Sequence, residues 1–359
     1  MRFRIPSGIT ALLIGIIVGF FDPTLDDNQL FRFLAQIGIT SLFVFAGLEV
    51  NFEELKEDKV YLSKYLSKSV LGMLLIAFAL KHFFALSFQN SLILSLGIFT
   101  PSAGFIINSL HSFKMHKDLE YWIKSKAISK EIVSIAILFI ALQFNNLKLL
   151  SFSLLFYIIL FLTLPKIFKF FFKFISPYAP NTEVPMLVVL SLICGVISKE
   201  LGAYYLVGAF IVGLIGSRFK KDIFHEDEEF IFKALNSFFN VFLPFYFFYA
   251  GLKMPFSAFN AQALYYGVIL FLIFIPLRFA LNSLSFKLFF KDFLENSYKV
   301  SFSLLPTLIF GLVIAGILKE RGEVPDKIIY SLIVYTLLSS LFPSALSLFS
   351  NRVTKGRAE

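Results

Sequence analysis

Two adjacent ionisable residues, Lys130 and Glu131, stand at the start of a membrane-length apolar run, within the stretch from Glu120 to Gln143. A carboxylate takes up either a proton or a small cation. An acid inside a membrane is costly and is by default a candidate functional residue. Because helix neighbours point about 100° apart, Lys130 could enter the same cavity, pair with another acid or extend to the membrane surface. Glu131 is therefore a candidate ion- and proton-binding residue, with a structural ion pair as the alternative.

The composition is that of a polytopic helical membrane protein. Of 359 residues, 57% are hydrophobic and 16% are charged, against about 45–50% and about 25% in soluble domains. Apolar runs long enough to cross a bilayer recur along the chain. The net charge of +9 comes from Lys and Arg between these runs, so it does not indicate a nucleic-acid partner. The single cysteine, Cys194, excludes a disulfide framework and a cysteine metal site. We expect no enzyme activity and no cofactor.

Twelve spanning helices are predicted, and the loop charges orient them. With the N-terminus inside, nineteen Lys and Arg fall in inner segments and seven in outer ones, which favours both termini in the cytoplasm. No cleavable signal precedes the first span, and a bacterial inner membrane is the expected location. The spans are Pro6–Phe21, Leu30–Val50, Leu62–Phe84, Phe88–Leu110, Trp122–Gln143, Leu149–Phe168, Val184–Ile197, Ala203–Ser217, Phe230–Leu252, Ala261–Leu284, Ser301–Leu318 and Ile328–Phe349.

Two of these spans are interrupted. The fourth carries Thr100-Pro101-Ser102 and Gly104 at its middle, and the eleventh carries Pro306. Proline removes a backbone donor, and backbone groups freed at that depth must be buried or line a wet cavity. Interrupted helices at matching positions of two halves indicate a transporter site near the midplane. Ordinary proline kinks are the alternative.

The breaks also suggest an internal repeat. Helices one to five match helices eight to twelve, and five spans is an odd number, so the repeats are expected to be inverted. They would cover about 1–143 and 203–349, with linker helices at about 149–198. The fold class predicted is an all-α membrane protein in which the broken fourth and eleventh helices cross. We expect a single transmembrane domain over 1–359, without a soluble regulatory domain.

Six blocks, in order, resemble the monovalent cation:proton antiporter superfamily on its Kef-like branch, the sodium/hydrogen exchanger membrane domain. The third block is similar to the family's unwound ion-site helix. The blocks are IPSGITALLIGIIVGF, AQIGITSLFVFAGLEV, FTPSAGFIINSL, EVPMLVVL, LGAYYLVGAFIVGL and NVFLPFYFFYAGLKM. The family usually has one further helix before the first block.

The resemblance assigns roles to residues. It implies that Glu131 is the proton- and cation-binding carboxylate of helix five. Lys130 departs from the Gln, Asn or Asp that usually precedes it. Arg278 corresponds to a basic residue often found in helix ten, where it is either the site's counter-charge or a helix-end anchor. The hydroxyls of Thr100 and Ser102 would add oxygen ligands for Na⁺ or K⁺.

The implied function is secondary antiport of a monovalent cation, Na⁺ or K⁺, against H⁺, by competition at one carboxylate. The expected partners are these two ions, the lipid bilayer and a second copy in a homodimer. Two alternatives remain: a non-transporting or channel-like module of the same fold, and an organic-anion symporter in which Lys130 and Arg278 bind a carboxylate. Lys126 and Lys130 lie four residues apart, so a later start of helix five would place both in a wet vestibule.

Overall fold

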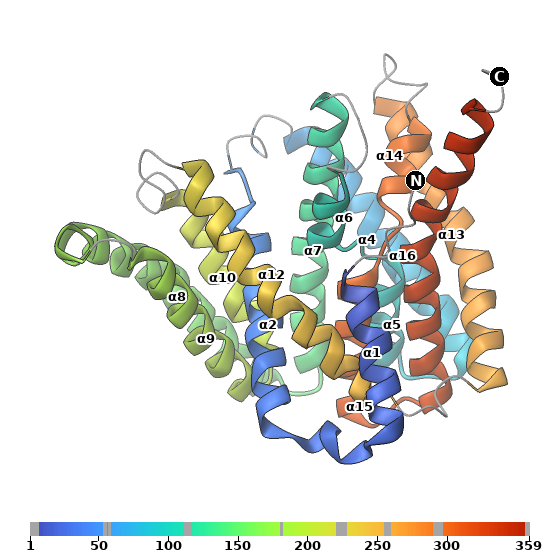
Figure 1. Ribbon diagram of the computed structural model, residues 1–359, viewed down its shortest axis with the longest axis horizontal. Coiled ribbons are helices and arrows are strands. Elements are labelled where there is room, and N and C mark those ends of the chain that lie inside the picture. Colours follow the sequence, from blue (N-terminus) through green and yellow to red (C-terminus); the bar gives the residue numbers. More distant parts are fainter. Residues whose placement is uncertain are drawn as a thin grey trace. The chain divides into compact units, whose positions relative to one another are not determined.

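The structure is a computed structural model, and it describes residues 7–52, 56, 59–110, 117–179, 182–219, 228–254, 260–289 and 297–355. All regular structure in these residues is helical and forms the twelve expected spans, two of them broken (Figure 1). The helices are α1 (Ser7–Phe21), α2 (Gln29–Leu48), α4 (Lys59–Phe84), α5 (Phe88–Phe99), α6 (Ala103–Leu110), α7 (Lys117–Gln143), α8 (Leu147–Phe174), α9 (Glu183–Glu200), α10 (Tyr205–Gly216), α12 (Glu228–Leu252), α13 (Ala261–Phe289), α14 (Ser297–Ser303), α15 (Leu308–Arg321) and α16 (Asp326–Lys355), with short 3₁₀ turns at Pro23–Asp27, Ser176–Tyr178 and Ser217–Phe219.

The lengths of the apolar runs placed most helix ends within a few residues, and one expectation about helix five was wrong. α7 begins at Lys117, ahead of the predicted Trp122. Lys126 and Lys130 therefore lie inside the helix, and both are buried. A late start with the two lysines in a wet vestibule does not occur, because aromatic side chains of α4 and α5 cover them.

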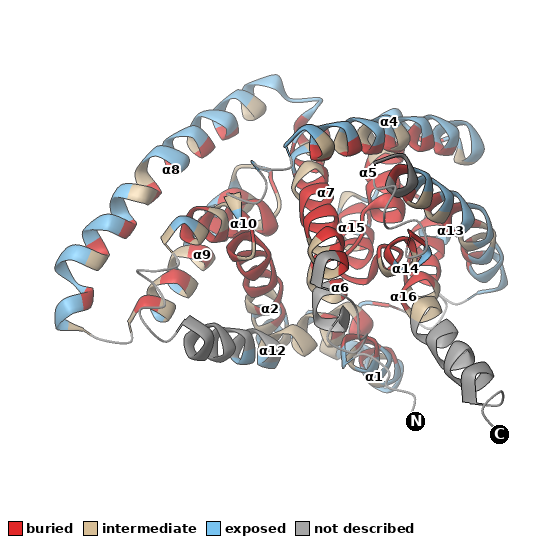
Figure 2. Ribbon diagram, turned by 90° about the horizontal axis from the view of Figure 1, so that it is seen from above, coloured by how far each residue is buried: buried red, intermediate tan, exposed pale blue. Residues whose placement is uncertain are grey.

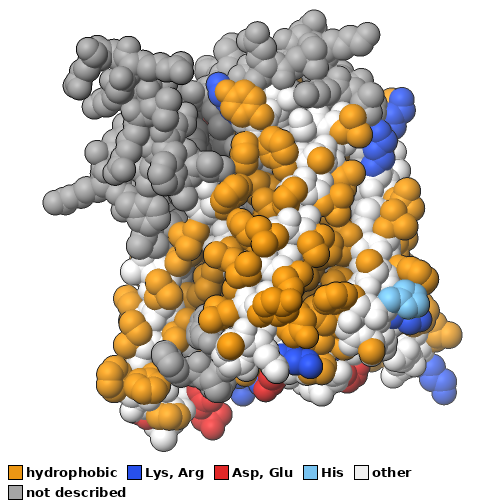
Figure 3. Space-filling view, turned by 90° about the vertical axis from the view of Figure 1, so that its right-hand side faces the viewer, with side chains coloured by type: hydrophobic (Ala, Val, Ile, Leu, Met, Phe, Trp, Pro, Cys, Tyr) orange, Lys and Arg blue, Asp and Glu red, His pale blue; other side chains and the backbone are white. Residues whose placement is uncertain are grey.

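The outward-facing side chains are apolar. Five stretches of the described residues are long and apolar enough to cross a bilayer by themselves: Gln29–Leu48, Lys59–Phe84, Leu147–Tyr178, Ala261–Ser285 and Ser297–Arg321. The exposed residues of α4, α8 and α13 are mostly Leu, Ile, Val and Phe. Figure 3 shows hydrophobic side chains gathered in a broad band on one face, with the charged ones toward its edges. Such a band is compatible with contact to lipid, and in water it would promote aggregation.

The chain folds as two compact units, each built from both halves of the sequence. The first unit comprises Met1–Ile5, Glu57–Leu138 and Phe256–Glu359, and the second comprises Pro6–Lys56 and Phe139–Pro255. The first unit thus holds both broken spans and Glu131. The predicted repeat boundaries at about 1–143 and 203–349 stay a prediction.

In the first unit, the half-helices α5 and α15 form the centre. They pack against each other, with α4 beside α5 and with α16 beside α15 and α13. Nine of the twelve residues of α5 and ten of the fourteen of α15 are buried, whereas α4 and α13 are buried along one face only (Figure 2). The least hydrated part of this unit therefore contains helix ends, where backbone groups lack partners within their own helix.

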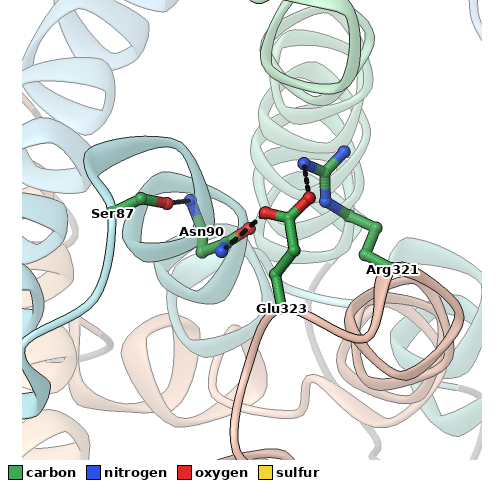
Figure 4. A network of polar contacts seen from close by, with 4 residues as sticks. All are labelled: Ser87, Asn90, Arg321 and Glu323. Carbon is green, nitrogen blue, oxygen red and sulfur yellow. Dashed lines mark hydrogen bonds and ion pairs between the residues drawn. The ribbon is translucent and has the colours of Figure 1, made fainter.

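A polar network ties the start of α5 to the turn between α15 and α16 (Figure 4). The side chain of Ser87 caps the Asn90 amide at 3.2 Å, and Asn90 Nδ2 donates to Glu323 Oε2 at 3.0 Å. Arg321 donates to the other oxygen of Glu323 at 3.0 Å. Hydrogen bonding from Asn90, with a smaller contribution from Arg321, lowers the pKa of the Glu323 carboxyl. The contact is thus present above the ordinary carboxylate pKa and weakens as pH falls through the lowered value.

In the second unit, α2 and α10 cross with their backbones in contact. α2 packs on α10 and α12, and α10 also packs on α9. A Cβ at Gly213 would overlap the carbonyl oxygen of Val44, and one at Gly47 would meet Phe210 and Leu214 backbone atoms. Small residues permit this close approach in membrane helices, where van der Waals packing holds helices together.

We predict that Gly213→Ala lowers the free energy of unfolding of the detergent-solubilised protein by about 1–3 kcal/mol, seen as a lower thermal unfolding midpoint. The reason is that the new Cβ would overlap the backbone of Val44, which cannot move aside as a side chain can. Gly216→Ala on the same helix is the matched control. Its Cβ would meet only side-chain ends, Leu187 and Leu48 methyls at 3.2 Å, which can shift. Equal midpoints for the two variants would contradict the backbone crossing.

Candidate ion-binding site

The first break separates α5 from α6 at Thr100, Pro101 and Ser102. Thr100 has an extended backbone, φ −84° and ψ 123°, as expected for a residue that precedes proline. All three break residues are buried. Gly104 is the second residue of α6. The predicted interruption of helix four is thus present, and it places the C-terminus of one half-helix and the N-terminus of another in the interior.

The second break, around Pro306, meets the first one. α14 ends at Ser303 and α15 begins at Leu308. The amide of Ser102 donates to the carbonyl of Pro306 at 2.9 Å. The predicted crossing of the two broken helices is therefore present, and a backbone hydrogen bond joins them where neither chain is helical.

Ser102 caps the second half-helix from the first break. Its Oγ accepts from the amides of Ile309 at 2.9 Å and Phe310 at 3.1 Å. Thr307, the local N-cap residue, makes no side-chain cap bond and instead pairs with the Ser339 hydroxyl at 3.0 Å. Ser102 thus accepts from two N-terminal amides of α15 that Thr307 does not cap.

Glu131 lies at the start of α6. Its Oε2 accepts from the amide of Ala103 at 3.2 Å, and the residue is only 3% exposed. Ala103 is the first residue of α6, where helix amides carry partial positive charge that favours an anion. The predicted candidate therefore does reach the break, and it does so through the backbone.

Thr100 and Ser134 link the break to α7 by hydroxyls. Thr100 Oγ1 donates to Ser134 Oγ at 2.8 Å, and Ser134 Oγ donates to the carbonyl of Lys130 at 2.8 Å. The extended residue of the break is therefore fixed against the same turn of α7 that carries Glu131. In this arrangement, the lone pairs of Thr100 Oγ1 remain for a further donor or a cation.

Arg278 is placed at the C-terminal ends of the half-helices. Its Nη2 donates to the carbonyl of Leu304, just after α14, and its Nη1 donates to the Tyr335 hydroxyl, both at 2.9 Å. Tyr335 in turn donates to the carbonyl of Ile98, near the end of α5, at 2.9 Å. One guanidinium thus serves both C-termini, where the helix dipole favours a cation. Arg278 itself lies within α13, and its expected roles as the site's counter-charge or as an anchor at the end of helix ten stay predictions.

Tyr335 was missed by sequence reasoning. It lies in an apolar stretch between Val334 and Thr336, with no neighbouring charge or break that would single it out. Only the packing of α16 beside α15 and α5 makes it the link between Arg278 and Ile98.

Lys130 and Lys126 are buried against aromatic rings. Lys130 is 2% exposed, and its Nζ lies 3.6 Å from the ring centre of Phe99. Lys126 is 0% exposed, and its Nζ lies 5.3 Å and 5.0 Å from the rings of Tyr61 and Tyr65. A cation–π contact is worth about 0.5–2 kcal/mol, whereas removing an ion from water costs several kcal/mol. Neither lysine extends to the membrane surface.

We predict that Tyr335→Phe destabilises the protein by about 1–3 kcal/mol, because the Ile98 carbonyl and one Arg278 donor then lose a partner in a buried place. Thermal unfolding in detergent measures this. The matched control is Tyr330→Phe on the same helix, whose hydroxyl only accepts from Lys319 near the surface at 3.2 Å. Equal losses in both variants would contradict the helix-end role of the Arg278–Tyr335 pair.

Solved structures of antiporters share this fold. The chain is similar to the sodium proton antiporter MjNhaP1 from Methanocaldococcus jannaschii at pH 8, with a TM-score of 0.65, 17% identity and coverage of 95% of this chain and 90% of that chain. An electron-microscopy structure of the same antiporter gives a TM-score of 0.67 at 16% identity, with 94% and 88% covered.

Curated relatives match over most of the sequence. A probable Na⁺/H⁺ antiporter 3 of Methanocaldococcus jannaschii is 23% identical over 353 residues, which cover 94% of this chain and 89% of the relative. A Na⁺/H⁺ antiporter of Enterococcus hirae is 25% identical over 374 residues, which cover 98% and 94%. The profile of the family described as sodium/hydrogen exchanger, transmembrane, matches residues 1–351. The chain belongs to this family of integral membrane transporters, which are not enzymes.

Proposed function

We propose that this protein is a secondary antiporter that exchanges Na⁺ for H⁺ at Glu131. The observation that carries the proposal is the buried Glu131 carboxylate, which accepts from the Ala103 amide within the crossing of two broken helices. Family membership supports cation:proton exchange, and both curated relatives are named as Na⁺/H⁺ antiporters. Sodium is therefore favoured over the K⁺ alternative.

Exchange follows from competition for one negative charge. Burial disfavours a bare carboxylate, while the α6 amide and nearby cations favour it. A proton or a sodium ion then neutralises Glu131, and either loaded form is cheaper to carry through a dry region than the bare anion. Obligatory exchange results if only the loaded forms cross. Thr100 Oγ1 and carbonyls freed by Pro101 are the oxygen ligands we assign beside Glu131.

The crossing supplies a reason for the position of this carboxylate. The N-terminus of α15 is already capped by Ser102, and the two C-termini are already served by Arg278. The N-terminus of α6 is the remaining end, and its partner is a side chain that can change charge. A change in the charge of Glu131 therefore alters the electrostatic interaction at the N-terminus of α6 and at no other helix end of the crossing.

The rival functions make different demands on the same residues. An organic-anion symporter would need Arg278 to bind substrate, whereas two of its five donors already hold the Leu304 carbonyl and the Tyr335 hydroxyl. A channel-like module would conduct cations without coupling to protons. The homodimer, the bacterial inner membrane and the cytoplasmic termini stay predictions, and residues 1–6 and 356–359 lie outside those described.

We predict that Glu131→Gln abolishes sodium-driven proton movement in proteoliposomes, measured with a pH-sensitive dye inside the vesicles, because an amide can neither lose a proton nor neutralise Na⁺. Potassium in place of sodium tests the cation. Glu323→Gln, which removes an exposed carboxylate of the same unit, is the matched control and should retain exchange. Full exchange in the Glu131 variant would overturn the assignment, and Na⁺ flux without protons would favour a channel.

A further inference from the structure

The last nine residues of α8 combine three lysines with five phenylalanines, in the sequence KIFKFFFKF. Lys166, Lys169 and Lys173 lie three and four residues apart, so they form one row along the helix. All three members of this lysine row are exposed. Within the described part of the chain, none of them forms an ion pair with an acid, and Lys173 Nζ lies 5.3 Å from the ring centre of Phe174.

The lysine row lies on the side of α8 that faces away from the second unit. Residues two positions apart in a helix point about 200° apart, and Phe168 and Phe171, each two positions after a lysine of the row, are buried together with Leu164. The ring of Phe168 stacks on the ring of Phe219, just after α10, with ring centres 5.4 Å apart. The rest of α8 is exposed along most of its length (Figure 2). The lysine row therefore faces the surroundings of the protein.

The length of α8 places the lysine row at the depth of lipid headgroups. With 28 residues, α8 is about 42 Å long, whereas the hydrocarbon core of a bilayer is about 30 Å thick. Its end turns therefore extend into the headgroup layer, and the flexible stems of the lysines let their ammonium groups reach that layer. The loop charges predict that this end of α8 is cytoplasmic, and the cytoplasmic leaflet carries anionic lipids.

A second row, made of apolar side chains, runs beside the lysine row. Ile167, Phe170 and Phe174 have the same spacing of three and four residues, and each is about half exposed. The rings of Phe170 and Phe174 lie 5.2 Å apart. This apolar row is displaced from the lysine row by one residue, which is about 100° around the helix. Ammonium groups next to an apolar strip are complementary to an anionic amphiphile, whereas a free phosphate would leave the apolar row uncovered.

We propose that the end of α8 is a binding surface for an anionic phospholipid. The lysine row holds the phosphate of the headgroup, and an acyl chain lies along the apolar row. Three cations opposite one anionic headgroup give the surface its preference for anionic over zwitterionic lipids. The surface belongs to the second unit and includes none of the residues assigned to the exchange site. Lipid binding here therefore does not depend on Na⁺/H⁺ exchange.

The experiment titrates the purified full-length protein in detergent with phosphatidylglycerol and counts bound lipids by native mass spectrometry. Phosphatidylcholine with the same acyl chains is the zwitterionic comparison and should bind more weakly. Replacing all three lysines of the row by Gln should raise the half-saturating phosphatidylglycerol concentration at least about tenfold, because each lysine near an anionic lipid contributes about fivefold. The matched control removes the same charge from three exposed lysines elsewhere and should leave that concentration nearly unchanged: Lys81→Gln, Lys148→Gln and Lys253→Gln.

The wild-type protein supplies a second readout that needs no variant. A ligand bound only by the folded state raises the thermal unfolding midpoint with its concentration, so phosphatidylglycerol should raise the midpoint, whereas glycerol 3-phosphate, which has the anion without the chains, should not. Equal binding of the two lipids, equal losses in the two triple variants, or equal midpoints with phosphatidylglycerol and glycerol 3-phosphate would overturn the proposal. Neither readout involves sodium or proton transport, so failure here leaves the proposed exchange standing.

Discussion

The constraint that governs the first unit is the presence of four helix ends in a dry interior. Each end carries about half an elementary charge and backbone groups that have no partner in their own helix. Each end has a specific side chain as its partner. Arg278 serves both C-termini, directly at Leu304 and through Tyr335 at Ile98. Ser102 caps α15, and Glu131 faces α6.

The partners of the four helix ends differ in whether their charge can change. A guanidinium keeps its charge at any physiological pH, and a serine hydroxyl has none to lose. Glu131 alone among the end partners can exchange its charge for a proton or a cation. Three of the helix ends thus have partners of constant charge, and the N-terminus of α6 has a partner whose charge can change. Lys130 and Lys126 are held against rings of α4 and α5 and do not enter the helix-end bonds.

Sequence reasoning found the parts that depend on local chemistry. Pro101 and Pro306 predicted the breaks because proline removes a backbone donor and clashes with the preceding turn. Glu131 was singled out because acids are rare in apolar runs. It did not find the parts that depend on packing. Nothing local marks Tyr335 as a partner of Ile98, and the depth of Lys126 depends on tyrosines sixty residues earlier in the chain. For the same reason, the contacts of Arg278 with Leu304 and Tyr335 could not be predicted from its position in helix ten.

The most direct test of the central claim is the number of protons released when Na⁺ binds to the purified protein in detergent. Calorimetric titrations in two buffers of different ionisation enthalpy give this number without a membrane or a transport cycle. If sodium and a proton compete for Glu131, sodium binding releases protons when Glu131 starts protonated, and this release vanishes in Glu131→Gln. Sodium binding with unchanged proton release in that variant would contradict the account.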